Sequence, residues 1–315
     1  MIYILITLIL ITASYIYLKL AVKYRIIDRP NERSSHTKVT VRGGGIIFPI
    51  AILSFFFFND YQYPYFVLGV FLISLVSFLD DIYTLKAKFR FPFQFIAVGL
   101  VLFQLDIPLE VLALLYVFLG IGVINLFNFM DGINGVTGLY SMAVLSVFYF
   151  INLQEEIINS ELIIYTLISL FIFGFYNFRK KAIFFAGDIG SVSIGTLIFF
   201  MGLYFAVALK SPLIILAIIV YGADTGCTFL YRKLFTDENV FDPHRHHIYQ
   251  KLVDVKKVSH LTVSLSYAII QLLMNVVLYK TYQLELNTQL FVLFAVIIVF
   301  MLIYLLLFQK LKVRS

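Results

Sequence analysis

Four aspartates lie in short polar stretches of an otherwise apolar chain. Asp80 and Asp81 are adjacent in FLDDIYTLKAKFR, Asp131 lies in NFMDGINGVTG, and Asp188 lies in FFAGDIGSVSIG. Adjacent carboxylates repel each other unless a cation lies beside them. A hard divalent ion such as Mg²⁺, which also binds phosphate oxygens, is a natural partner for such a pair. An adjacent pair also occurs at solvated loop entries, and Asp188 could instead cap the helix that follows it.

A basic stretch that contains three glycines precedes these acids. The sequence DRPNERSSHTKVTVRGGG occupies residues 28–45. We expect its glycines to open a helix and to bring backbone N–H groups close to an anion. Positive charge for that anion would come from Arg33, His36, Lys38 and Arg42. The same cations could instead act only as signals for membrane topology.

A cluster of histidine and arginine lies in FDPHRHHIYQKL, residues 241–252. The cluster contains no cysteine, and the adjacent His246 and His247 lack the one-face spacing of zinc ligands on a helix, so a structural zinc site is disfavoured. We prefer the interpretation that His244, Arg245 and His247 face phosphate groups.

The elements that must position these residues are membrane-spanning helices. Hydrophobic residues make up 61% of the 315 residues and charged residues 13%, and there are 34 Phe. No soluble domain is this apolar throughout, so the composition predicts an all-α polytopic membrane protein. About eleven apolar segments approach the ~20 residues that cross a bilayer. They are 1–22, 43–59, 65–79, 92–105, 108–124, 137–152, 161–177, 189–208, 211–230, 259–280 and 288–309.

The distribution of Lys and Arg predicts the orientation of these helices. With the N-terminus outside, the inner loops and tail hold all but three of the 24 basic residues, the exceptions being Lys19, Lys210 and Lys280. The C-terminus and all five histidines then lie on the cytoplasmic side. The net charge of +6 therefore needs no nucleic-acid partner, although some cations could hold anionic membrane lipids. Residues 1–22 lack the basic region and cleavage site of a signal peptide, so we treat them as the first span.

The polar chemistry thus gathers on one predicted face, where the active site would lie. A transporter usually needs polar residues at mid-membrane depth as well, and the sequence offers almost none there. Several carboxylates, a basic glycine-containing loop and a His/Arg cluster on one side of a membrane suit metal-assisted phosphoryl transfer. A membrane transporter or a flippase for lipid-linked sugars is the alternative.

Five motifs in this order resemble the polyprenyl-phosphate N-acetylhexosamine-1-phosphate transferases, the MraY/WecA-like group of glycosyltransferase family 4. They are RSSH…RGGG (33–45), FLDD (78–81), NLFNFMDGINGVTG (125–138), GDIGS (187–191) and HRHHIYQKL (244–252). The resemblance implies that undecaprenyl phosphate, or another polyprenyl phosphate, attacks the β-phosphorus of a UDP-N-acetylamino sugar. Polyprenyl-diphosphate-sugar and UMP would result, with Mg²⁺, or Mn²⁺ in its place, as cofactor.

The resemblance also implies roles for individual residues. Asp188 would be the leading metal ligand, and Asp131 would be a catalytic acid and a further metal ligand. His247 would act in catalysis by contacting the phosphates or the sugar of the donor. The residues that would bind substrate are Arg33, His36, Lys38, Arg42, Asn128, Asn134, His244 and Arg245.

The resemblance places the catalytic residues Asp80 and Asp81 beside the lipid phosphate, with one of them as the usual candidate for a general base. A phosphomonoester with a second pKa of about 6 is largely ionised near pH 7. A base is then not required, so we expect Asp80 or Asp81 mainly to orient the lipid phosphate and the metal.

The chain departs from the family pattern at several positions. Asn134 replaces an aspartate that is common in the family, and an amide there could hydrogen-bond uracil or ribose. Tyr249 and Gln250 follow His247 where relatives have a denser run of histidines. This form resembles the WbpL-type branch, which implies a donor of the UDP-FucNAc or UDP-QuiNAc type, with UDP-GlcNAc as the alternative. Asp224 lies inside an apolar segment, as part of the site or as a purely structural acid.

We expect a single transferase domain over residues 1–315, with a long cytoplasmic loop at 231–258 that carries the His/Arg motif. The resemblance implies a multi-pass protein of the inner (cytoplasmic) membrane that initiates a cell-envelope glycan such as O-antigen. The sequence leaves the oligomeric state open, a homodimer included.

Overall fold

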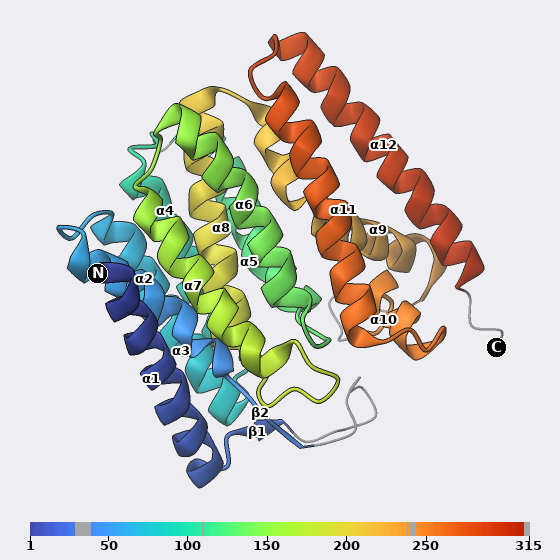
Figure 1. Ribbon diagram of the computed structural model, residues 1–315. Coiled ribbons are helices and arrows are strands. Elements are labelled where there is room, and N and C mark those ends of the chain that lie inside the picture. Colours follow the sequence, from blue (N-terminus) through green and yellow to red (C-terminus); the bar gives the residue numbers. More distant parts are fainter. Residues whose placement is uncertain (29–38, 109, 238, 240–243, 312–315) are drawn as a thin grey trace.

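Helices make up most of the computed structural model, which describes residues 1–28, 39–108, 110–237, 239 and 244–311 (Figure 1). Within these residues the sheet consists of two antiparallel strands of two residues each, β1 (Ile27–Asp28) and β2 (Thr40–Val41). The helices are α1 (Ile2–Tyr24), η1 (Gly44–Ile46), α2 (Ile47–Phe58), α3 (Pro64–Tyr83), α4 (Ala87–Gln104), α5 (Val111–Met130), α6 (Val136–Glu155), α7 (Ser160–Asn177), α8 (Gly187–Leu209), η2 (Pro212–Ile218), α9 (Ile219–Phe235), α10 (Ile248–Asp254), α11 (His260–Thr281) and α12 (Leu286–Lys310).

All eleven apolar segments expected from the sequence coincide with helices. Among the described residues, nine helical stretches are long and apolar enough to cross a membrane, and η1 with α2 forms a shorter apolar helix at Gly44–Phe58. The helix α4 begins earlier than expected, at Ala87, and so includes Lys88 and Arg90. The structure confirms an all-α, multi-pass membrane protein; the count of eleven spans and their orientation stay predictions.

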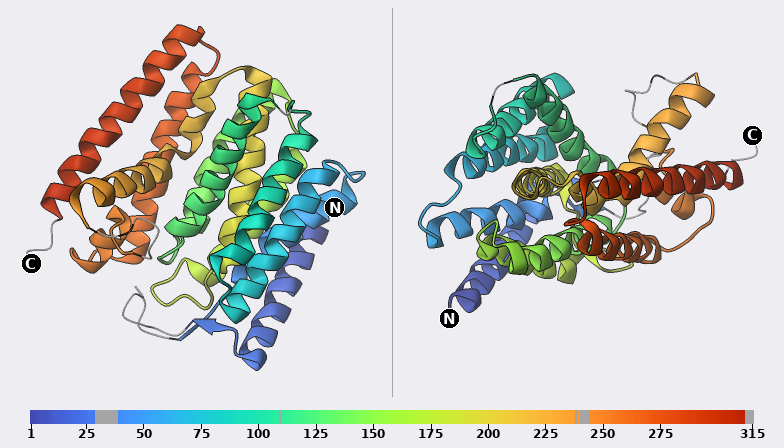
Figure 2. Two further views of the ribbon diagram at one scale, coloured as in Figure 1. Left: turned by 180° about the vertical axis from the view of Figure 1, so that it is seen from behind. Right: turned by 90° about the horizontal axis from the view of Figure 1, so that it is seen from above.

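The connections between helices sort into two ends of the bundle. At one end Tyr3 donates to Glu161 at 2.7 Å, and Tyr282 donates to Glu155 at 2.8 Å. At the other end α1, α3, α5 and α7 finish, and α4, α6, α8 and α11 begin (Figures 1 and 2). We call this second end the site end, because the described parts of all five motifs lie there.

The helix α8 runs through the middle of the bundle (Figure 2). Nearly all its residues from Ile189 to Phe205 are buried, and it packs on α2, α3, α5 and α6. A Cβ at Gly195 would lie 3.1 Å from the Cα of Ile124, which shows how closely α5 approaches it. In contrast α12 keeps most of its apolar surface exposed, as a lipid-facing helix does.

Polar side chains do occur at mid-depth, contrary to the expectation from the sequence. Gln271, in the middle of α11, accepts from the Val220 N–H at 3.3 Å and donates to the Leu216 carbonyl at 2.9 Å. Tyr140 of α6 accepts from the Tyr221 N–H at 3.2 Å. The chain changes there from η2 to α9, and the backbone groups this change frees must find partners away from water. Gln271 and Tyr140 therefore supply hydrogen-bond partners for the backbone where η2 changes to α9.

Candidate active site

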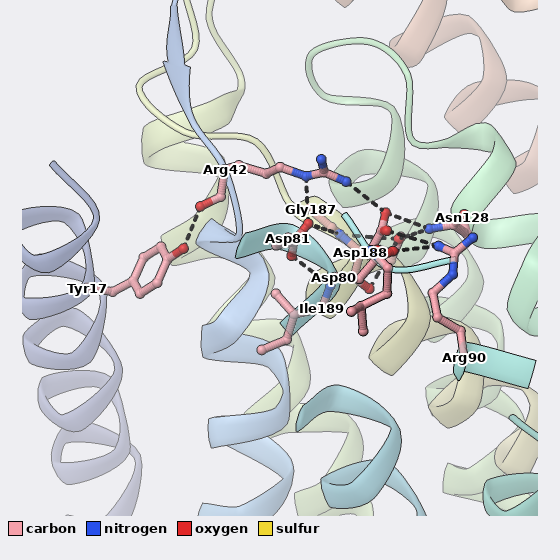
Figure 3. A network of polar contacts seen from close by, with 11 residues as sticks. Tyr17, Arg42, Asp80, Asp81, Arg90, Asn128, Gly187, Asp188 and Ile189 are labelled. Carbon is pink, nitrogen blue, oxygen red and sulfur yellow. Dashed lines mark hydrogen bonds and ion pairs between the residues drawn. The ribbon is translucent and has the colours of Figure 1, made fainter. Parts of the chain in front are cut away.

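Asp81, a residue of α3, caps the N-terminus of α8. Its side chain, near the end of α3, is fully buried. Its Oδ1 accepts from the Asp188 N–H at 2.9 Å and its Oδ2 from the Ile189 N–H at 3.1 Å (Figure 3). These N–H groups at the start of a helix lack partners within it and lie at the positive end of its dipole. The alternative role considered for Asp188, capping α8, is therefore filled by Asp81.

The contact between Asp81 and α8 depends on Gly187, the first residue of α8. Its φ of 72° lies in the left-handed region. A Cβ there would lie 2.5 Å from Asp81 Oδ2 and 2.6 Å from the Gly43 nitrogen. Glycine thus lets three segments, far apart in the sequence, meet at one point.

Arg90, in the first turn of α4, joins the other two carboxylates of the cluster. Its Nη1 lies 2.6 Å from Asp80 Oδ2 and 3.2 Å from Asp188 Oδ2 (Figure 3). Reciprocal hydrogen bonds of 3.0 and 3.2 Å between the amides of Gln94 and Asn125 fasten α4 to α5. The helix that carries Arg90 is therefore held in place about one turn further along.

Arg42 approaches the same carboxylates from the segment between β2 and η1. Its Nε lies 2.6 Å from Asp81 Oδ1, and its Nη2 lies 3.4 Å from Asp188 Oδ1. The Tyr17 hydroxyl donates to the Arg42 carbonyl at 2.5 Å and so fixes the backbone there. Burial by itself would lower the pKa of Arg42, but Asp188 and Asp81 outweigh it and raise that pKa, so the guanidinium stays charged.

Asn128, in the last turn of α5, completes the group around Asp188. Its Nδ2 donates to Asp188 Oδ1 at 2.9 Å and to Ser191 Oγ at 3.2 Å. The Asp188 side chain is 17% exposed, against 5% for Asp80 and 0% for Asp81. Asp188 is thus the most accessible acid of the cluster Asp80, Asp81 and Asp188, which we call the acid cluster.

The expectation that Gly44 and Gly45 offer free N–H groups to an anion is wrong. The Gly44 N–H donates to the Phe185 carbonyl at 2.8 Å, and the Gly45 N–H to the Ala186 carbonyl at 2.9 Å. A Cβ at Gly45 would lie 2.4 Å from the Cα of Gly190. These glycines serve close packing of η1 against the start of α8. The basic residues Arg33, His36 and Lys38 lie outside the described residues.

Asp131 lies just beyond α5 and is largely enclosed. Its Oδ1 accepts from Thr137 Oγ1 at 2.5 Å. Burial, with a smaller contribution from the negative charge of Asp188, raises the pKa of Asp131 to about 7 despite the Thr137 hydrogen bond. The charge of the acid cluster therefore affects the pKa of Asp131, but the hydrogen bond of its side chain is to Thr137 of α6.

Asn134 is buried, and the chain itself uses its side chain. Its Nδ2 donates to the Arg179 carbonyl at 2.8 Å, and the backbone carbonyl of Asn134 accepts from Ser264 Oγ at 2.8 Å. The neighbouring Gly135 N–H donates to Asn177 Oδ1 at 2.6 Å, while Asn177 Nδ2 donates to the Phe184 carbonyl at 3.0 Å. Both asparagines tie the Asp131 loop to the segment before α8. The role of Asn134 in nucleotide binding stays a prediction.

The His/Arg motif leads into a short helix, so the stretch 231–258 is not all loop: it contains the end of α9 and the whole of α10. The His247 side chain is buried, with its Nδ1 3.0 Å from Asp224 Oδ1. The His244 ring packs on the His247 ring at a centroid distance of 4.9 Å. Arg245 Nη2 lies 2.5 Å from Asp254 Oδ2. Contact of this motif with phosphates stays a prediction.

The donor chemistry of the acid cluster fits Mg²⁺. Oxygens of Asp80 and Asp188 both lie within 3.2 Å of one nitrogen of Arg90, so both can reach a common cation. The described residues hold no group of three His, Cys, Asp or Glu arranged to bind a metal ion. Protein-bound Mg²⁺ commonly takes only one or two carboxylates and completes its shell with water and substrate phosphates. Asp188 and Asp80 are therefore the ligands that the geometry favours.

Sequence reasoning missed several residues of the site. The sequence places Arg90 only among the basic residues of an inner loop, because its role depends on α4 starting early. Tyr249 was read as a departure from a histidine run, yet its hydroxyl donates to the Phe129 carbonyl at 3.0 Å and so connects α10 to the end of α5. Tyr17 and Asn177 carried no local signal, since each acts on a segment distant in the sequence.

The fold and the acid cluster together define a multi-pass membrane protein with a site of carboxylates and arginines at one end of its helix bundle. The family model described as glycosyl transferase family 4 matches residues 63–206, which include Asp80, Asp81, Asn128, Asp131 and Asp188. The middle part of this chain is thus similar to glycosyl transferase family 4. The resemblance to the MraY/WecA-like group is thereby confirmed, while its placement in the WbpL-type branch stays a prediction.

Three curated relatives show how far the similarity extends. A probable undecaprenyl-phosphate N-acetylglucosaminyl 1-phosphate transferase of Bacillus subtilis is 27% identical over 263 residues, which cover 75% of this chain and 72% of the relative. An undecaprenyl-phosphate alpha-N-acetylglucosaminyl 1-phosphate transferase of Salmonella typhi is 27% identical, covering 78% of this chain and 74% of the relative. A protein of the same name from Thermotoga maritima is 24% identical, covering 78% and 80%.

Proposed function

We propose that this protein transfers an N-acetylamino-sugar-1-phosphate from a UDP-sugar to undecaprenyl phosphate or another polyprenyl phosphate and releases UMP. The observation that carries the proposal is the acid cluster, in which carboxylates from α3 and α8 meet Arg42 and Arg90 at one end of a membrane bundle. The names of the relatives, which are undecaprenyl-phosphate sugar-1-phosphate transferases, support it.

The charge balance of the cluster suits a diphosphate that arrives with a divalent cation. Three carboxylates face two guanidinium groups, so one negative charge is left without a partner within the cluster. Asp188 and Asp80 would hold Mg²⁺, or Mn²⁺ in its place, and Asp131 stays a predicted further ligand. The bound ion would neutralise charge that develops on the phosphates. Arg42 and Arg90, released from carboxylates that bind the ion, could then bind phosphate oxygens bidentately.

In the proposed reaction an oxygen of the lipid phosphate forms a bond to the β-phosphorus of the donor. The bond from the β-phosphorus to the bridging oxygen breaks, and UMP leaves with that bonding pair. The lipid phosphate is already largely ionised near pH 7, so no proton has to be removed from it. Asp80 and Asp81 therefore position charged groups, in keeping with their bonds to Arg90 and to the backbone N–H groups of Leu85, Asp188 and Ile189.

The sugar of the donor is a separate question. The relatives are named for N-acetylglucosamine, which favours UDP-GlcNAc. The Tyr249–Gln250 form of the histidine motif favours donors of the UDP-FucNAc or UDP-QuiNAc type. A panel of these donors, offered at equal concentration, separates the two predictions.

We further propose that the site end faces the cytoplasm and that the protein resides in the inner membrane, where it would initiate a cell-envelope glycan such as O-antigen. The concentration of Lys and Arg in the connections at the site end supports this orientation.

The test uses the purified full-length chain with undecaprenyl phosphate and the donor panel. We expect release of UMP that needs both substrates, stops with EDTA and returns with excess Mg²⁺. A matched Asp188→Asn variant should lose at least 100-fold in rate. Failure to release UMP from any donor would overturn the proposal and favour the transporter or flippase alternative.

A further inference from the structure

Asp224 is a fully buried acid that the proposed reaction does not use. It lies in the second turn of α9 with 0% of its surface exposed. Its Oδ1 lies 3.0 Å from His247 Nδ1 and accepts from the Ile248 N–H at 3.1 Å and from Thr228 Oγ1 at 3.3 Å. Its Oδ2 accepts from the Tyr249 N–H at 3.3 Å and from the Tyr267 hydroxyl. A buried carboxylate with this many donors is satisfied as an anion.

These donors come from three elements that the sequence separates. Thr228 belongs to α9, Tyr267 belongs to α11, and Ile248 and Tyr249 are the first two residues of α10. The Tyr249 hydroxyl then reaches the Phe129 carbonyl near the end of α5. Asp224 therefore fixes the start of α10 next to the loop that carries Asp131.

The contact with Asp224 also determines which nitrogen of the His247 ring carries the hydrogen. An ionised carboxylate accepts hydrogen bonds and donates none, so the hydrogen between these atoms must lie on Nδ1. A neutral ring then has Nε2 as its acceptor atom. Among the described residues Nε2 of His247 has no hydrogen-bond partner. This atom is also not fully buried by the surrounding protein. It is thus the ring atom left for a substrate.

We propose that Asp224 is a positioning residue that acts through His247. It holds the imidazole in one orientation and one tautomer, so that the acceptor Nε2 is presented to a hydrogen-bond donor of the substrate, such as a hydroxyl group of the sugar. Carboxylates that hold a histidine by its other ring nitrogen have this effect in other sites. The inference rests on the proposed function only for the identity of the substrate. The pairing of Asp224 with Nδ1 stands on its own.

A double-mutant cycle separates positioning from a purely structural role. We expect Asp224→Asn to lower the rate of UMP release about 10- to 100-fold, and His247→Ala to lower it at least as much. If Asp224 acts through His247, the double variant should match His247→Ala within about threefold, because no ring is left to position. Thr228→Val removes another donor to the same oxygen and is the matched control, with a rate within about twofold of wild type.

Losses that multiply in the double variant would overturn the proposal, as would a wild-type rate for Asp224→Asn. A readout independent of turnover is the ¹⁵N NMR spectrum of the ring nitrogens, assigned with His247→Ala and recorded at alkaline pH. We expect Nδ1 of His247 to carry the proton in the wild-type protein. A ring protonated at Nε2 would overturn the proposal even if Asp224→Asn failed to fold. A wild-type protein that released no UMP but showed Nδ1–H would refute the proposed function alone.

Discussion

At the scale of single residues, the three acids of the cluster differ in how their oxygens are used. Both oxygens of Asp81 accept backbone N–H groups of α8, and the side chain is buried. Asp188 accepts only from side chains, and part of it is accessible. Asp81 therefore stabilises the start of α8, the helix that carries Asp188. Substitutions at the two positions should differ in their effects on stability and on turnover.

We expect Asp81→Asn to destabilise the protein and Asp188→Asn mainly to abolish turnover. An amide at position 81 cannot accept from two N–H groups while facing Arg42, and loss of a buried charge partner costs roughly 3 kcal/mol. Thermal unfolding of the two purified variants without substrate, measured beside UMP release, checks this. Equal melting temperatures for both variants would contradict the capping role of Asp81.

Asp131 should make stability depend on pH. Its pKa of about 7 in the folded chain lies above the usual value near 4, which the unfolded chain would have. The folded state then binds more protons between those values, so this contribution to stability is complete below pH 4 and is lost as the pH rises to 7. We expect the melting temperature in EDTA to fall less steeply between pH 5 and 7.5 in Asp131→Asn than in wild type. Parallel profiles would argue against burial of this carboxyl.

At the scale of elements, the site forms where η1 meets α8. The N–H groups of Gly44 and Gly45 donate to carbonyls just before the start of α8. Arg42 lies two residues before η1 and contacts Asp81. The position of Arg42 relative to Asp81 and Asp188 thus depends on how closely two backbones approach.

Substitution of glycine by alanine tests this approach. A Cβ at Gly45 would lie 2.4 Å from the Gly190 Cα and 2.8 Å from the Ala186 oxygen, both backbone atoms that cannot move aside. A Cβ at Gly99 of α4 would meet nothing within 4 Å. We expect Gly45→Ala to lower both the yield of folded protein and the activity. Gly99→Ala should be neutral or stabilise by up to about 1 kcal/mol. Similar behaviour of the two variants would refute the packing described here.

The helices and the polar motifs could be predicted from sequence, because apolar length and local composition determine them. Asp80, Asp81, Asn128 and Asp188 do gather as the motifs indicated. The partners of each acid could not be predicted, since Asp81 meets α8 more than a hundred residues later. The role assigned to Gly44 and Gly45 was wrong for the same reason: their N–H groups are used by a segment that local sequence does not reveal.

At the scale of the whole molecule, the described parts of all five motifs lie at one end of a membrane bundle. The proposed reaction requires that end to face the nucleotide pool. Single cysteines introduced at exposed residues in a Cys227→Ser background test the orientation. We expect Asp60→Cys to react with a membrane-impermeant maleimide in intact cells, and Lys86→Cys to react only after the membrane is opened. The reverse pattern would invert the topology.

The central claim is that sugar and phosphate move together to the lipid. It is tested most directly with a UDP-N-acetylamino sugar labelled with ³²P at the β-phosphorus, incubated with undecaprenyl phosphate and the purified chain. We predict that the label appears in the organic-extractable lipid in the same amount as the UMP released, and that Asp188→Asn abolishes both. Label that remained in UDP, or appeared in water-soluble sugar phosphate, would contradict it.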